Sequence, residues 1–216
     1  MDKETLRTFF AVVGLVVLAL VVPAEGRAQV RGACEGRPAI GGAMSLWTIP
    51  MGIDPALAGA GGLNGLARGT GPGIEGSIQG VIPVGDVWSV TGEFGAGRRG
   101  VEIYRLQDGT EVRRDTGDAL HIQRFTAGVM MRRQGTRIAC VYLAVAGGPH
   151  RFSYRGGSAT VLGGAIKIGV EVPTSDAIAI YVDMGINAIF NVETVAPLAD
   201  PVLAGIRPTL GVRYRF

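Results

Sequence analysis

Five charged residues are spaced so that they could do chemistry together. Each occupies a polar position in a stretch in which apolar and polar residues alternate. Three are acidic and two are basic: Glu75, Glu93, Asp183, Arg124 and Lys167. Two carboxylates held close together can act as general acid and general base. Beside cations, the same carboxylates would instead form structural ion pairs, because buried charges must be paired. The elements that carry these residues decide between the two roles.

Other reactive residue types predict no site. His121 and His150 have no cysteine, histidine or carboxylate at a metal-ligand spacing. Two matches to G-x-G-x-x-G begin at Gly71 and Gly95, but neither leads into a helix, as a nucleotide fingerprint must. Among 35 glycines such matches arise by chance. We therefore expect no cofactor, no metal and no enzymatic activity.

The elements are predicted to be β-strands throughout. Alternating stretches are separated by clusters of Gly, Pro, Asp and Ser, and each is long enough for a tilted strand to cross a bilayer, which takes about 9 to 11 residues. The eight stretches are residues 38–49, 72–82, 87–97, 119–132, 137–148, 158–172, 177–190 and 206–216.

The connections alternate in length. Short ones, "PVGD", "RQGT" and "PTSD", follow the second, fourth and sixth stretches, and long ones follow the other four. In the second long connection, Asp108-Gly109 is a hairpin signal, so the flanking strands are expected to continue as a ribbon. Short turns on one side and long loops on the other are typical of a transmembrane barrel with up-and-down topology.

Alternation alone does not say which face points inward. An exported soluble ligand-binding barrel would place its apolar side chains inside and its charges outside, with the same sequence pattern. The loop pattern, the N-terminal export signal and the final strand, which ends on Phe216, favour the inverted arrangement with lipid outside.

The first residues predict export. Lys3 and Arg7 precede an apolar run too short for a spanning helix, and small residues follow it. Residues 1–28 are interpreted as a cleaved signal peptide and 29–216 as one barrel domain. Ala24 offers a second cleavage point, and a retained anchor helix is the alternative. The net charge of +3 indicates no nucleic-acid partner.

The chain closes with "LGVRYRF", in which Val212, Tyr214 and Phe216 alternate with basic residues. In this ending and in its strand pattern, the sequence resembles the small eight-stranded outer-membrane barrels of Gram-negative bacteria, of the OmpA-barrel, OmpX and OmpW type. The resemblance implies an all-β, antiparallel up-and-down transmembrane β-barrel with short periplasmic turns and longer extracellular loops. It also implies outer-membrane lipid and lipopolysaccharide as partners, and a barrel-assembly machinery that recognises Val212, Tyr214 and Phe216.

In a barrel this small, the charged residues meet inside. Eight strands enclose only enough room for side chains, so Glu75, Glu93 and Asp183 are expected to pair with Arg124 and Lys167 and to plug the lumen. Catalysis by a carboxylate pair is the alternative.

Cys34 and Cys140 are the only cysteines, and an exported protein folds in an oxidising compartment. Cys140 is expected to face the lumen near the periplasmic end, and the segment that precedes the first strand could fold across the opening and reach it. We expect a disulfide between them; two unpaired thiols are the alternative.

The predicted function is a structural or surface-interaction role, such as envelope integrity or adhesion, with an extracellular ligand as a further partner of the loops. A narrow pore for small solutes, an exported soluble ligand-binding barrel and an enzyme are the alternatives.

Overall fold

The computed structural model describes residues 36–47, 66–107, 110–134, 138–190 and 202–216. The predicted signal peptide and most of the first and last long connections lie outside these ranges, whereas residues 66–71 and 202–205, predicted as connections, belong to strands. The described residues form eight strands: β1 (Ala39–Trp47), β2 (Leu66–Pro83), β3 (Trp88–Gln107), β4 (Thr110–Gln134), β5 (Cys140–Tyr154), β6 (Gly157–Pro173), β7 (Ile178–Phe190) and β8 (Val202–Arg215). No helix in this part of the chain is long and apolar enough to span a membrane.

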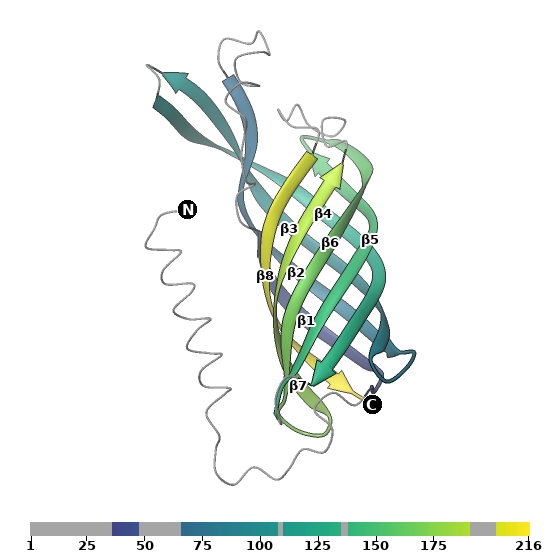
Figure 1. Ribbon diagram of the computed structural model, residues 1–216. Coiled ribbons are helices and arrows are strands. Elements are labelled where there is room, and N and C mark those ends of the chain that lie inside the picture. Colours follow the sequence, from purple (N-terminus) through teal and green to yellow (C-terminus); the bar gives the residue numbers. More distant parts are fainter. Residues whose placement is uncertain (1–35, 48–65, 108–109, 135–137, 191–201) are drawn as a thin grey trace.

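The eight strands close into a barrel (Figure 1). Each strand pairs antiparallel with the next along the chain, and β1 pairs with β8 from Ala39 opposite Arg215 to Ser45 opposite Thr209. Closure leaves no sheet edge, so every strand has a hydrogen-bonded neighbour on both sides. The predicted antiparallel up-and-down barrel is confirmed.

The two ends of the barrel differ. Residues 84–87 and 174–177 form short turns at one end, tightened by hydrogen bonds such as that from the Val84 amide to the Trp88 carbonyl, 2.9 Å. The start of β1 and the end of β8 also meet there, where the Phe216 amide donates to the Pro38 carbonyl at 3.0 Å. We call this the short-turn end, and the opposite one the ribbon end.

The ribbon end takes its name from β3 and β4, which continue past the rim as a paired ribbon (Figure 1). Beyond an irregularity between Gly100 and Glu102, the pairing runs from Glu102 opposite Asp115 to Gln107 opposite Thr110. The predicted continuation of both strands is therefore confirmed, while Asp108 and Gly109 lie outside the described residues.

The connection between β5 and β6 is shorter than predicted. Instead of a long loop from residue 149 to residue 157, both strands extend and Tyr154 pairs with Gly157 across a two-residue turn. Arg155 and Gly156 in this turn have φ values of 47° and 83°. Two positive φ angles twist a tight turn in the same sense as the strands, which lets the hairpin close without a loop.

Candidate functional site: the filled lumen

The two faces of each strand have opposite chemistry over the middle of the barrel. On β2, Glu75, Ser77 and Gln79 are buried inside, whereas Ile74 and Ile78 are exposed on the outer wall. The same alternation recurs on β3, β4 and β6, because successive side chains of a strand point to opposite faces. The soluble-barrel alternative requires the opposite arrangement. An apolar outer wall around a charged interior is the polarity of a transmembrane barrel.

Glu75 is the centre of the charged layer. Its carboxylate accepts hydrogen bonds from Arg124 Nε at 2.9 Å and Nη2 at 2.7 Å, and from Arg207 Nη1 at 2.8 Å. The indole Nε1 of Trp47 donates to its second oxygen at 3.0 Å. All four side chains are buried. Charge-assisted bonds of this kind are stronger than neutral ones and offset the cost of burying the ions.

Glu93 extends this layer to further strands. Its carboxylate accepts hydrogen bonds from Arg124 and from the ammonium group of Lys167. Arg207 Nη2 lies 3.7 Å from the same carboxylate. The ionic layer therefore consists of two carboxylates and three cations drawn from five strands: Glu75, Glu93, Arg124, Lys167 and Arg207.

Four of the five residues predicted for the network thus come together. Asp183 instead accepts a hydrogen bond from the hydroxyl of Tyr142, at 2.9 Å. The register explains the difference: Asp183 pairs with Gly169, whose partner on β5 is Tyr142, whereas Lys167 pairs with Gly185.

One member of the ionic layer, Arg207, and one residue that donates to it, Trp47, were missed from the sequence. Arg207 lies on the same face of β8 as Arg213, and that period of two was the available signal. Trp47 ends β1, and its ring packs beside two guanidinium groups, with Arg99 Cζ 5.2 Å and Arg207 Cζ 5.7 Å from its centroid.

A second polar layer lies toward the short-turn end. Arg213 pairs with Glu171, and its Nη2 donates to Gln79 Oε1 at 2.7 Å. The rings of Tyr142 and Tyr181 flank its guanidinium group, with centroids 5.1 Å and 4.0 Å away. Cation–π contacts of this kind strengthen when water is excluded.

Toward the ribbon end the lumen is filled by an apolar cluster, beside which the guanidinium group of Arg99 is also buried. The side chains that form this cluster come from β1 and from β3 to β7: Trp47, Val101, Leu120, Ile122, Phe152, Val161 and Ile189. On the outer wall of β4 and β5 at this level the exposed residues are polar, as with His121 and Gln123 on either side of buried Ile122 and Arg151 beside buried Phe152. The stretch "ALHIQ", residues 119–123, therefore alternates with inverted polarity, apolar inside and polar outside, because a strand that has left the lipid faces water.

The remaining predicted residues occupy different places. Val212, Tyr214 and Phe216 are exposed on the outer wall at the short-turn end, and the Tyr214 and Phe216 rings meet edge to face with centroids 5.2 Å apart. Cys140 is buried inside at the start of β5. Cys34 lies outside the described residues, so the disulfide remains a prediction.

No protein-family model matches the chain, and no curated protein does. Solved structures do match. The outer membrane protein OprG from Pseudomonas aeruginosa is 12% identical, over 86% of this chain and 98% of that one, with a TM-score of 0.52. The Neisserial surface protein A is 13% identical, over 82% of this chain and 97% of that one, with a TM-score of 0.52. Together with the closed sheet and its apolar wall, these matches show that the chain has the fold of the small eight-stranded outer-membrane β-barrels.

Proposed function

We propose that this protein is a non-conducting barrel in the outer membrane of a Gram-negative bacterium, with a structural or surface-interaction role such as envelope integrity or adhesion. The filled lumen is the observation that supports this proposal. An apolar cluster, the ionic layer around Glu75 and the layer around Arg213 follow one another along the axis. A solute that entered would have to separate buried ion pairs. The function is therefore expected to depend on the outer surfaces of the barrel and not on transport through it.

Conductance measurements test the closed lumen. The refolded protein is inserted into planar bilayers and single-channel current is recorded. The expected result is a silent bilayer, and an open porin inserted into the same bilayers serves as the positive control. Stable current steps from the unmodified protein would support the runner-up function, a narrow pore for small solutes.

The ribbon of β3 and β4 supports the surface-interaction part of the proposal. It carries paired backbone beyond the rim, where no bilayer contact requires it. A variant that joins Glu102 to Asp115 through a two-residue turn removes the ribbon, together with the β3 residues that pair with the start of β2, and keeps the pairing of β2 with β3 from Gly73 onward. If the role is contact, this variant loses attachment of the cells to surfaces while the envelope still excludes detergents. A variant that lets detergents in and still attaches would favour the structural role.

Export and assembly complete the proposal. A cleaved signal peptide over residues 1–28 would deliver the chain to the periplasm, and Val212, Tyr214 and Phe216 would be read by the barrel-assembly machinery. The exposure of these three side chains on one face supports such a contact. We also propose that the protein is not an enzyme, since three of its buried lumen carboxylates, Glu75, Glu93 and Glu171, are committed to cations.

A further inference from the structure

Two rows of polar side chains cross the outer wall near the ribbon end. In the upper row, Arg98 of β3 pairs with His121 of β4, which pairs with Ser153 of β5, and Ser153 pairs with Ser158 of β6. In the row below, Arg151 of β5 lies between Gln123 and Thr160. All of these side chains except Ser153, which is half-buried, are exposed.

The apolar belt of the outer wall ends directly beneath these rows. Phe94 pairs with Phe125 on β3 and β4, and Pro149 pairs with Leu162 on β5 and β6. Phe94, Phe125 and Leu162 are all exposed, at 50%, 56% and 68%. Arg151 is only two residues along β5 from Pro149, which is about 6.6 Å of strand. The polar rows therefore lie at the level where a bilayer passes from acyl chains to headgroups.

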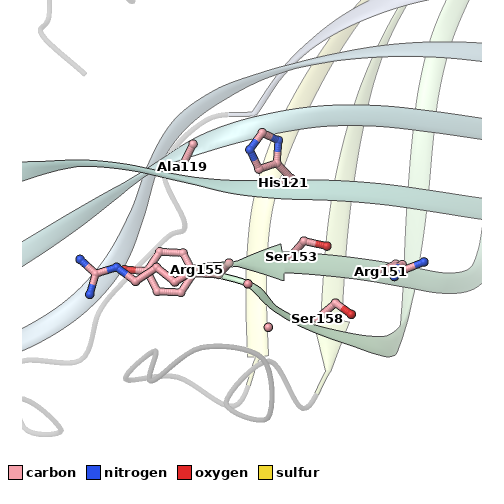
Figure 2. A pocket seen from close by; sticks show the side chains of 9 residues that line it. Ala119, His121, Arg151, Ser153, Arg155 and Ser158 are labelled. Carbon is pink, nitrogen blue, oxygen red and sulfur yellow. The ribbon is translucent and has the colours of Figure 1, made fainter.

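A surface hollow of about 440 Å³ lies within these rows. Figure 2 shows Arg151 and Arg155 on either side of Ser153 along one hairpin, with His121 on the neighbouring strand and Ser158 on the returning one. Hydroxyl, imidazole and guanidinium groups line the hollow, and none of its nine lining residues is a carboxylate. Such a set of donors fits a phosphate group.

The cations of the hollow differ in how they are held. Arg155 donates to Asp118 from Nε at 3.0 Å and Nη2 at 2.6 Å, and this hydrogen bond raises the pKa of Arg155. In the described part of the chain, His121 and Arg151 form no ion pair. Their donors are exposed to solvent and available to a ligand.

We infer that this hollow binds the phosphorylated sugar headgroup of an outer-leaflet lipopolysaccharide, with Arg151 and His121 as its principal phosphate ligands. Ser153 and Ser158 add hydroxyl donors, and the acyl chains of the same lipid pack on Phe125 and Leu162. The inference rests on the outer-membrane placement proposed above. A headgroup is favoured over free phosphate because the hollow sits directly on the apolar belt, so one lipid can satisfy both surfaces.

Native mass spectrometry of the refolded protein tests the site. The probe is diphosphoryl lipid A, titrated into the detergent-solubilised barrel and compared with dephosphorylated lipid A. Arg151→Gln removes the charge and keeps a hydrogen-bonding side chain, and the double variant adds His121→Gln. Arg133→Gln is the matched control, because Arg133 is equally exposed on β4 but lies at the short-turn end.

The expected result is that Arg151→Gln weakens binding of the diphosphoryl lipid about tenfold, the double variant weakens it further, and Arg133→Gln leaves it within about twofold. Dephosphorylated lipid should bind the unmodified protein as weakly as it binds the variants. Equal losses in Arg151→Gln and Arg133→Gln would overturn the site, since the effect would then be net charge alone. Displacement of the lipid by an equal concentration of inorganic phosphate would overturn the assignment to a headgroup.

Each variant is first run unboiled on a denaturing gel, so that loss of binding is scored only for folded barrel. Failure of the site would leave the non-conducting barrel untouched, because bilayer recording decides that proposal without lipid A. Conversely, a conducting barrel could still bind the headgroup on its outer wall.

Discussion

The guanidinium carbon of Arg213 lies 4.0 Å from the centre of the Tyr181 ring, inside a closed barrel whose outer wall is apolar. Tyr181 in turn lies over Gly211, its partner in the pairing of β7 with β8. A Cβ atom added at Gly211 would be 2.4 Å from Cζ of the tyrosine. The glycine therefore provides the space in which the ring can reach the cation.

Gly211→Ala is expected to destabilise the barrel by about 1–3 kcal/mol, because the new methyl group would overpack against the Tyr181 ring. Gly76→Ala is the matched control, since a Cβ at Gly76 on the outer wall meets no atom within 4 Å. Urea unfolding in lipid vesicles measures both. An equal loss of unfolding free energy in the two variants would show that Gly211 is required for backbone conformation and not for the space that the Tyr181 ring occupies.

Glu75→Gln is expected to cost about 3–5 kcal/mol, because only Glu93 would remain to neutralise Arg124, Arg207 and Lys167 while all three stay buried. Adding Arg207→Met should restore part of this loss, since one of the two uncompensated charges is then removed. The temperature at which the unboiled gel band converts to the unfolded form reports the order of stabilities. A double variant less stable than Glu75→Gln would contradict the pairing.

Phe152→Ala is expected to cost about 3–5 kcal/mol, because Phe152 is fully buried in the apolar cluster and its loss leaves a cavity. Phe125→Ala on the outer wall should cost much less, since lipid chains fill the space. Equilibrium unfolding of the two variants in the same vesicles makes the comparison. Similar costs would mean that the ribbon end is not packed as a core.

Removal of Phe216 is expected to reduce the amount of folded barrel in the outer membrane of cells severalfold, because the proposed assembly signal loses its last aromatic side chain. Refolding of the same variant from urea into detergent should be nearly unchanged, since Phe216 is exposed. Cell fractionation and refolding yield are the two measurements. An equal loss in cell fractionation and in refolding yield would show that Phe216 stabilises the barrel and is not a recognition element.

The predicted disulfide is checked by mass spectrometry of peptides prepared without reduction. A peptide pair that joins Cys34 to Cys140 is the expected species, and its yield should fall to zero in Cys140→Ser. Alkylated Cys34 in the unreduced, folded protein would rule the bond out.

The strand pattern predicted which side chains point inward but not which ones meet. The inward positions Glu75, Glu93 and Lys167 follow directly from a period of two. Asp183 lies inside as predicted but bonds to Tyr142, and Arg207 was overlooked, because which inward residues meet depends on the register between strands, which no single stretch encodes.

The limits of the strands were also set by tertiary context. Predicted strand ends fell where alternation of apolar and polar residues stopped in its membrane form. At Phe152, past the predicted end of the fifth stretch at residue 148, β5 continues with an apolar residue inside and polar Arg151 outside, as it must once polar surroundings replace the lipid chains. The same change of surroundings concealed the hairpin of β5 and β6, whose upper part was predicted as a loop.

The chain contains two tryptophans, and the barrel separates them completely. Trp47 is 1% exposed within the lumen, whereas Trp88 is 48% exposed on the outer wall. Fluorescence quenching by brominated lipids should therefore detect Trp88 alone. The emission of Trp47 should change when Arg99 and Arg207 pack against its ring during folding. Two single-tryptophan variants separate the signals. Trp47→Phe, which keeps Trp88, would report the rate of entry into the bilayer, and Trp88→Phe, which keeps Trp47, would report the rate at which the lumen packs. Their comparison can establish whether the wall inserts before the lumen packs.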